Sequence, residues 1–318
     1  MKRILLVGFG GMGHVHYVNI QRMDNAEIVG ITGTEHDRKA AEKTGLPFFL
    51  SITEGIQKLS PDAVDITTPT FLHKLHVMEA LECGVDVICE KPLALSASDA
   101  AEIYRTAEDK GLRVFPALVM RYTKEFAVLS SLIHNGEYGK LIKADFHRLS
   151  PMPEWTAGNW LFDKDKSGLI PFDLHIHDLD MIYALFGEPE CIDSYAPVDM
   201  KTGFPCYYSI EYGYENLSVH AEAGWLRTSM PFTSGWRMIF EKAVAVNEDG
   251  RISIYPEKKE MQDLTPHYDI VISTGINVPP TGWYYEEIKH IISEMDGSEK
   301  AKISRDEAVG VLRIAERL

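Results

Sequence analysis

A glycine-rich stretch near the start of the chain constrains the fold more than any other feature. It reads Gly8-Phe9-Gly10-Gly11-Met12-Gly13. The apolar run 4–7 precedes it, and apolar residues at helical spacing follow from residue 15 to residue 23. A strand, a G-x-G-x-x-G turn and a helix in this order are typical of a dinucleotide-binding unit, in which the backbone amides of the turn approach a pyrophosphate. An ordinary glycine turn is the alternative.

The end of the second predicted strand, 27–32, bears on which dinucleotide binds. A carboxylate about 20 residues past the last glycine usually holds the ribose of NAD, but this chain has Gly33-Thr34 there. Nothing at that point would repel a 2′-phosphate, and Thr34, His36 and Arg38 could hydrogen-bond one. The sequence therefore leans toward NADP over NAD. In the alternative, Arg38 only opens the next helix and points into solvent.

Strand and helix patterns alternate through the first 120 residues. Helices are predicted at 53–59, 74–83 and 96–110, and strands at 63–67, 85–89 and 112–120. This alternation predicts an α/β domain with a doubly wound parallel sheet. We place the domain boundary after residue 120, which gives a Rossmann domain over 1–120 and a second domain over 121–318.

Two of the predicted strands end in polar residues, at the edge where open parallel sheets bind ligands. After 63–67 come Thr68, Pro69, Thr70 and His73. These residues could border a cofactor, and ordinary loop and N-cap chemistry is equally compatible with them.

The strand at 85–89 runs into Glu90-Lys91-Pro92. An ammonium at a strand end suits hydride transfer, because it can stabilise the alkoxide that develops as hydride leaves carbon. The alternative is a surface Glu-Lys pair before a turn.

Beyond residue 120 the pattern changes from alternation to a long run of strands. A helix is predicted at 126–133, a strand at 140–149, strand-like sequence over 191–254, and closing helices at 281–295 and 305–317. We expect an α+β domain with a large open mixed or antiparallel sheet, one face of which is covered by helices.

A second polar constellation lies between Ser167-Gly168 and residue 185. On a helix, Asp173 and His177 would be one turn apart, so that the carboxylate could hold the imidazole as a general base. On a strand, His175 and His177 would share a face and could bind a metal together. No third ligand supports that reading, so no metal is expected. His177 could also be a satisfied core histidine.

Charge and cysteine usage exclude several classes of protein. A net charge of −15 disfavours nucleic acids and anionic membranes, and no targeting or membrane-spanning segment is recognisable. We therefore expect a cytoplasmic protein whose partner is a small molecule. The four cysteines have no C-x-x-C spacing and are expected to be reduced.

The glycine turn, Thr68-Pro69 with His73, Glu90-Lys91-Pro92, and Asp173 with His177 together resemble the glucose-fructose oxidoreductase / inositol dehydrogenase / MocA (Gfo/Idh/MocA) family. The resemblance covers nearly the whole chain. It implies an NAD(P)-dependent dehydrogenase of sugars, cyclitols or related compounds that forms homodimers or homotetramers through its open sheet.

By the same resemblance, Lys91 is the catalytic lysine, His177 the acid/base and Asp173 the carboxylate of the site, while Glu90 supports Lys91. Arg121 and Tyr284 fall where members of the family line the substrate or cofactor pocket. Apart from the resemblance, Trp160 is expected to contact substrate, since it lies with Trp155 on the loop 150–166 that sets specificity.

This sequence departs from the family pattern at four positions. Ser167-Gly168 is a shortened glycine-rich approach, His175 stands where a small residue is usual, Thr70 replaces a common asparagine, and Gly33 replaces a common acid.

The leading hypothesis is reversible hydride transfer between a secondary alcohol or ketone and C4 of a nicotinamide. A cofactor-sensing protein of the same fold without turnover is one rival. Reduction of a non-sugar carbonyl or imine is another, suggested by Trp155, Trp160, Trp225 and Trp236, although such aromatics are more often core or interface.

Overall fold

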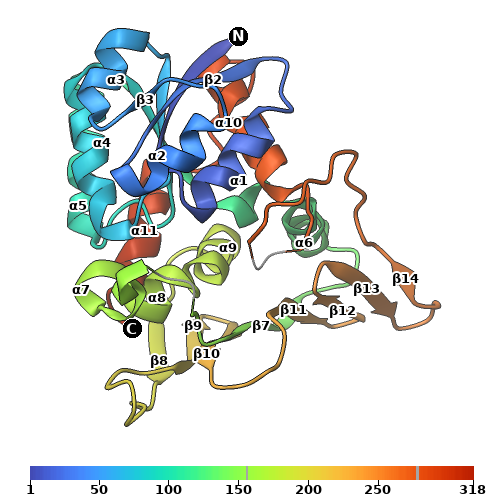
Figure 1. The fold of residues 1–318 in the computed structure, drawn as a ribbon. Coiled ribbons are helices and arrows are strands. Elements are labelled where there is room, and N and C mark those ends of the chain that lie inside the picture. Colours follow the sequence, from blue (N-terminus) through green and yellow to red (C-terminus); the bar gives the residue numbers. More distant parts are fainter. Residues whose placement is uncertain (155–156, 277–278) are drawn as a thin grey trace.

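The computed structural model describes residues 1–154, 157–276 and 279–318, which form two lobes (Figure 1). In the first lobe, six parallel strands pair in the order β3-β2-β1-β4-β5-β6. Their bounds are β1 Lys2–Val7, β2 Ala26–Thr32, β3 Phe48–Phe49, β4 Ala63–Ile66, β5 Asp86–Glu90 and β6 Val114–Ala117. This order is that of a doubly wound dinucleotide-binding sheet, with its switch point between β1 and β4. The predicted fold class of the first half is confirmed.

The helices of the first lobe cover both faces of this sheet. They are α1 Gly11–Ile20, α2 Glu35–Glu42, α3 Ile52–Leu59, α4 His73–Glu82 and α5 Ala97–Asp109, with short 3₁₀ turns η1 Thr70–Leu72 and η2 Val119–Tyr122. The central strand β1 is an apolar run whose residues Ile4, Leu5 and Leu6 are fully buried, as expected where helices cover both faces. The predicted boundary after residue 120 falls within η2.

The second lobe is built on a mixed sheet of eight strands in the order β14-β13-β12-β11-β7-β10-β9-β8. The bounds are β7 Leu141–Pro151, β8 Cys191–Tyr195, β9 Tyr207–Tyr214, β10 Leu217–Leu226, β11 Thr233–Phe240, β12 Ala243–Glu248, β13 Arg251–Pro256 and β14 Gln262–Asp263. The pairing of β7 with β10 is parallel and the other pairings are antiparallel. The expected large mixed sheet is confirmed.

Among the residues that the structure describes, helices lie on only one face of the second sheet, between it and the first lobe (Figure 1). They are α6 Lys124–His134, η3 Ala157–Phe162, α7 Lys164–Ser167, α8 Leu169–Asp173 and α9 Ile176–Phe186. Along β7, Ala144, Phe146 and Arg148 are buried against them, whereas Asp145 and His147 face the other side and are half-buried. Within the described residues, no helix is long and apolar enough to cross a bilayer.

The last two helices return to the first lobe. Helix α10 (Trp283–Asp296) packs beside α1, and α11 (Arg305–Ala315) packs against α5 and α9. The region 121–318 therefore contributes to both lobes, and the chain crosses between them more than once. This return places α10 against α1, the helix that follows the glycine turn.

Gly13 is the glycine of the turn with the least free space around it. A Cβ at Gly13 would overlap the carbonyl oxygen of Gly8, whereas a Cβ at Gly10 would meet nothing within 4 Å. We expect Gly13→Ala to destabilise the chain by about 1–3 kcal/mol, since overpacked sites force the backbone to shift. Thermal unfolding without any ligand measures this, with Gly10→Ala as the matched control. Equal melting temperatures for the two variants would contradict the close helix–strand contact.

Candidate active site

The carboxyl end of β5 brings Lys91 to the junction of the two lobes. Glu90 is buried and its Oε2 accepts the backbone N–H of Lys91 at 2.9 Å. The Lys91 ammonium donates to Oδ1 of Asp173 at 3.0 Å and to the carbonyl oxygen of Asp173 at 2.7 Å. Lys91 and Asp173 keep 17% and 20% of their side chains exposed, so the ion pair faces a partly open space. The structure thus brings together two residues that are distant in the sequence.

Asp173 and His177 do not share one helix, contrary to the expectation from their spacing. Helix α8 ends at Asp173 and α9 begins at Ile176. Between them the N–H groups of Leu174 and His175 both donate to the carbonyl of Ile170, which offsets the helix by one residue. The Asp173 carboxylate binds Lys91 instead, because a charge-assisted bond to an ammonium is the stronger one. Among the described residues, nothing hydrogen-bonds Nδ1 of His177.

The surroundings of His177 keep its imidazole neutral. Burial lowers its pKa well below the ordinary value, and the positive charges of Lys91 and Arg148 lower it further. Arg148 is buried on β7 and binds both carboxylate oxygens of Asp178, at 3.0 and 2.7 Å. A neutral histidine beside an ammonium can accept a proton. The charges of Lys91 and Arg148 therefore both act on the imidazole of His177.

His175 belongs to the core of the second lobe. Its Nε2 lies 2.7 Å from the hydroxyl oxygen of Tyr212 on β9, and both side chains are buried. Burial, followed by the charge of Arg148, lowers the pKa of His175 to about 3. His175, which stands where the family usually has a small residue, therefore packs against the sheet of the second lobe. The described residues contain no group of three or more side chains that could hold a metal ion.

Tyr284, Trp160 and Arg121, which were expected to line a substrate pocket, lie in three different surroundings. Tyr284 on α10 is buried, and burial, followed by the charge of Glu90, raises the pKa of its hydroxyl. Trp160 is half-buried on η3, with its ring centroid 6.1 Å from that of Phe71 on η1, so these aromatics meet across the lobes.

Arg121 lies in a buried cluster at the junction of η2, α9 and α11, where it contacts Glu307 and lies 3.6 Å from Asp180. This arrangement points to a structural role for Arg121 rather than the expected position in a pocket. Trp225 and Trp236 are also buried core residues, and Trp155 lies outside the described residues.

The glycine turn presents an uncapped helix end at the carboxyl edge of the sheet. Gly8 has φ +91 and donates its N–H to the carbonyl of Thr32 at 2.7 Å. Helix α1 begins at Gly11 with Gly10 as N-cap and has no side-chain cap. Backbone N–H groups at such an end, with open space at Gly10, are suited to bind an anion. The buried Phe9 and the half-buried Met12 pack against the hydrophobic core.

The loop after β4 borders the same edge. His73 is buried, with its two ring nitrogens 2.7 Å from the carbonyl oxygens of Thr68 and Pro92. It therefore joins this loop to the turn that carries Lys91. Thr70 is also buried, and the Thr68 hydroxyl lies 3.1 Å from Nδ1 of His76. These contacts favour a supporting role for His73 over a direct contact with a ligand.

A buried polar cluster beneath the site was missed by sequence reasoning. His16 on α1 lies 2.8 Å from Asp65 on β4 and 3.1 Å from Glu90, and all three side chains are buried. Glu287 on α10 is fully buried, and neither of its carboxylate oxygens has a hydrogen-bond partner among the described residues. The polar Asp65 within the apolar run 63–66 was the one available signal in the sequence.

The directions of the pKa shifts indicate which groups of this cluster are charged. Burial lowers the pKa of His16, but the larger combined effect of Asp65 and Glu90 raises it well above its ordinary value, so His16 is an imidazolium. Burial, with the charge of Glu90, raises the pKa of Glu287 well above its ordinary value, so Glu287 holds its proton. A neutral Glu287 limits the excess negative charge that would otherwise be buried.

Models of known protein families match the sequence of each of the two lobes. A model of an oxidoreductase family with an NAD-binding Rossmann fold matches residues 2–118, and a model of the GFO/IDH/MocA C-terminal domain matches residues 126–255. Glucose-6-phosphate 3-dehydrogenase of Bacillus subtilis is 32% identical over 192 residues, covering 58% of this chain and 54% of that one. An inositol 2-dehydrogenase of Pseudarthrobacter chlorophenolicus is 28% identical over 191 residues, covering 58% and 54%. The alignments span about half the length of these curated relatives.

Solved structures share the fold over the whole chain. UDP-N-acetylglucosamine 3-dehydrogenase from Acidithiobacillus ferrooxidans superimposes with a TM-score of 0.79 at 19% identity, covering 99% of this chain and 96% of that one. An oxidoreductase from Agrobacterium radiobacter superimposes with a TM-score of 0.85 at 17% identity, covering 99% and 94%. At this level of identity the likeness shows a common architecture of two lobes.

The protonated state of Glu287 predicts how stability depends on pH. The raised pKa means that the folded chain keeps a proton that the unfolded chain loses, so this residue costs stability as pH rises above about 4.5. Glu287→Gln is a neutral mimic of the protonated acid. We expect its melting temperature relative to the wild type to increase between pH 5 and pH 8.

The matched control for this variant is Glu286→Gln, at the half-buried neighbouring position of α10. Its melting temperature relative to the wild type should not show the same rise with pH. A Glu287→Gln variant that lost stability relative to the wild type as pH rose would show that Glu287 is ionised in the folded chain.

Proposed function

The chain belongs to the GFO/IDH/MocA oxidoreductase family, and from that membership we propose that it transfers hydride between C4 of a nicotinamide and a secondary alcohol or ketone. A sugar, a cyclitol or a related small molecule would carry this group. The observation that best supports the proposal is the meeting of the Lys91 ammonium with Asp173 beside a neutral His177. An imidazole base can take the hydroxyl proton, and an ammonium can stabilise the negative charge on the oxygen, so the two groups together suit alcohol oxidation.

Each side chain has one task in the proposed oxidation. Lys91 donates a hydrogen bond to the substrate hydroxyl and stabilises the negative charge that develops on its oxygen. His177 accepts the hydroxyl proton at a ring nitrogen. Asp173 orients the Lys91 ammonium. The sequence had instead led us to expect that Asp173 would orient the imidazole of His177. The carbon–hydrogen bond would break with both electrons leaving as hydride for C4 of the nicotinamide, so the products would be a ketone, a reduced dinucleotide and a protonated His177.

A bound nicotinamide dinucleotide supplies the hydride acceptor. The residues present fit such a group, because the first turn of α1 is uncapped and open at Gly10. We propose that the backbone of Gly8–Gly13 holds the pyrophosphate. Thr68, Pro69 and Thr70 would border the nicotinamide half, since they follow β4 at the switch point of the sheet. Trp160 and Tyr284 are the proposed substrate contacts.

The lean toward NADP drew on the absence of an acid at Gly33 and on Thr34, His36 and Arg38 as possible donors to a 2′-phosphate. In the structure the Arg38 guanidinium binds both carboxylate oxygens of Glu35, at 2.6 and 2.9 Å, and lies 4.7 Å from the ring centroid of Phe48. The exposed Thr34 and His36 carry no permanent positive charge. The preference for a 2′-phosphate thereby loses its main support.

Replacing Lys91 tests the proposed reaction. Lys91→Met should keep the affinity for a reduced dinucleotide while turnover falls by at least about a hundredfold, because a positioned electrostatic group is lost. Turnover is measured as dinucleotide reduction with a panel of sugars and polyols, and affinity as a fluorescence titration.

Lys74→Met is the matched control, since Lys74 forms a half-exposed ion pair with Asp99 and Glu102. Its turnover should stay near that of the wild type. A Lys91→Met variant with near-normal turnover would refute the assignment. Dinucleotide binding without turnover on any substrate would instead favour a sensor of the same fold.

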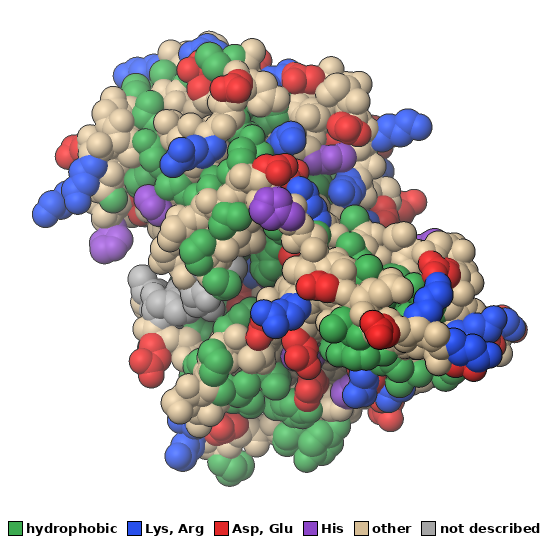
Figure 2. Space-filling view, turned by 90° about the vertical axis from the view of Figure 1, so that its right-hand side faces the viewer, with side chains coloured by type: hydrophobic (Ala, Val, Ile, Leu, Met, Phe, Trp, Pro, Cys, Tyr) green, Lys and Arg blue, Asp and Glu red, His purple; other side chains and the backbone are tan. Residues whose placement is uncertain are grey.

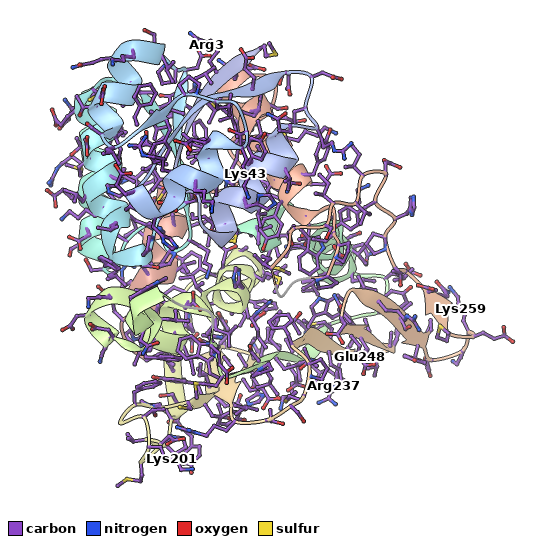
Figure 3. The ribbon with its side chains drawn as sticks, viewed as in Figure 1. Arg3, Lys43, Lys201, Arg237, Glu248 and Lys259 are labelled. Carbon is purple, nitrogen blue, oxygen red and sulfur yellow. The ribbon has the colours of Figure 1, made fainter. Side chains whose placement is uncertain are left out.

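We also propose that a second copy covers the open face of the eight-stranded sheet. Helices cover only its other face, and Arg237, labelled in Figure 3, lies on the uncovered side with Asp145. On the side of the molecule shown in Figure 2, hydrophobic side chains gather on the lower lobe while acidic and basic side chains are interspersed. Sedimentation at micromolar concentration should show a dimer or tetramer, and a monomer would contradict this.

A further inference from the structure

The position left vacant by Gly33 is filled by the carboxylate of Asp37. Strand β2 ends at Thr32, and a Cβ on Gly33 would lie 2.8 Å from Oδ2 and 3.2 Å from Cγ of Asp37. A strand-end Asp or Glu would begin its side chain at that same point. Asp37, four residues later on α2, therefore puts a carboxylate beside the place where a strand-end acid would put one.

Two hydrogen bonds hold this carboxylate in place. Its Oδ2 accepts the backbone N–H and the hydroxyl of Thr34, both at 2.9 Å. These bonds belong to a capping box at the start of α2, so the position of Asp37 is coupled to the beginning of the helix. Oδ1 has no hydrogen-bond partner among the described residues and remains available as an acceptor.

The carboxylate lies next to the start of the glycine turn. The Gly8 N–H donates to the carbonyl of Thr32 at 2.7 Å, and Val7 pairs with Thr32 in the parallel register of β1 and β2. The residue after Thr32 is Gly33, so Asp37 stands at the carboxyl edge of the strand beside β1. In sheets of this kind, an acid at this edge receives the 2′-hydroxyl of the adenosine ribose.

The guanidinium of the neighbouring Arg38 is engaged by other groups than Asp37. The guanidinium of Arg38 binds Glu35 through two hydrogen bonds and stacks on Phe48. A 2′-phosphate placed here would carry nearly two negative charges and would meet Asp37 within a few ångströms. Repulsion between like charges at about 4 Å is worth about 1 kcal/mol in water and more in a less polar surrounding.

We propose that Asp37 accepts the 2′-hydroxyl of the adenosine ribose and makes NAD the preferred cofactor over NADP. The inference rests on the proposed function, since it takes the glycine turn as the dinucleotide site. It reverses the lean drawn from the sequence, because that lean took Gly33 to leave the strand end without a carboxylate. Asp37 is a specificity-determining residue contributed by the helix.

Titrations of the whole chain with NADH and with NADPH, followed by nicotinamide fluorescence, test the inference without any substrate. The wild type should bind NADH at least about tenfold more tightly than NADPH. Asp37→Asn keeps the shape and the bonds to Thr34 but removes the charge. It should raise the affinity for NADPH and bring the ratio of the two dissociation constants close to one.

Two further variants serve as controls. Glu42→Gln makes the same change of charge at the exposed far end of α2 and should leave the ratio unchanged. Arg38→Gln should not reduce NADPH binding, because its guanidinium is already engaged by Glu35. A selective loss of NADPH affinity in Arg38→Gln would support a 2′-phosphate site and overturn the inference.

The remaining outcomes separate the inference from the function on which it rests. A wild type that binds NADPH as tightly as NADH, or an Asp37→Asn variant with an unchanged ratio, overturns the role of Asp37 and leaves the dinucleotide site intact. Failure of both reduced dinucleotides to bind the wild type overturns the dinucleotide site, and the role of Asp37 with it.

Discussion

The ion pair between Lys91 and Asp173 is the interaction on which the site depends. One partner ends a strand of the first lobe and the other ends a helix of the second, and their atoms meet at 3.0 Å with a second bond to the Asp173 carbonyl at 2.7 Å. Because each partner is fixed by its own lobe, the pair reports the relative position of the lobes. His177 then follows at the start of α9, where the charge of Lys91 lowers its pKa.

The pair is supported from below by buried polar groups of the first lobe. Glu90 fixes the backbone of Lys91 and is itself bonded to the imidazolium of His16. His16 lies one turn into the helix that follows the glycine turn, so the same helix contributes to the dinucleotide edge and to the support of Lys91. Removing one partner of such a buried charged group is costly, since the other is left unpaired. Helix α1 therefore links the glycine turn to the residues that support Lys91.

Local patterns predicted the parts of the site that are set by neighbouring residues. The turn at Gly8–Gly13 and the strand end before Lys91 each depend on a short run of sequence, and both were predicted. The geometry of Asp173 and His177 was not, because an ammonium from the other lobe attracts the carboxylate and the helix is offset after Ile170. The burial of Glu287 and the position of the Asp37 carboxylate could not be predicted from the sequence either, since each depends on contacts across a helix or between lobes.

The central claim is that Lys91 and His177 act on one oxygen of a substrate. A crystal structure of the chain with a nicotinamide dinucleotide and a turned-over sugar or polyol tests it most directly. The account predicts one hydroxyl oxygen within about 2.6–3.2 Å of both the Lys91 Nζ and a ring nitrogen of His177, with its carbon facing the nicotinamide. A substrate held elsewhere, or in contact with only one of the two side chains, would contradict it.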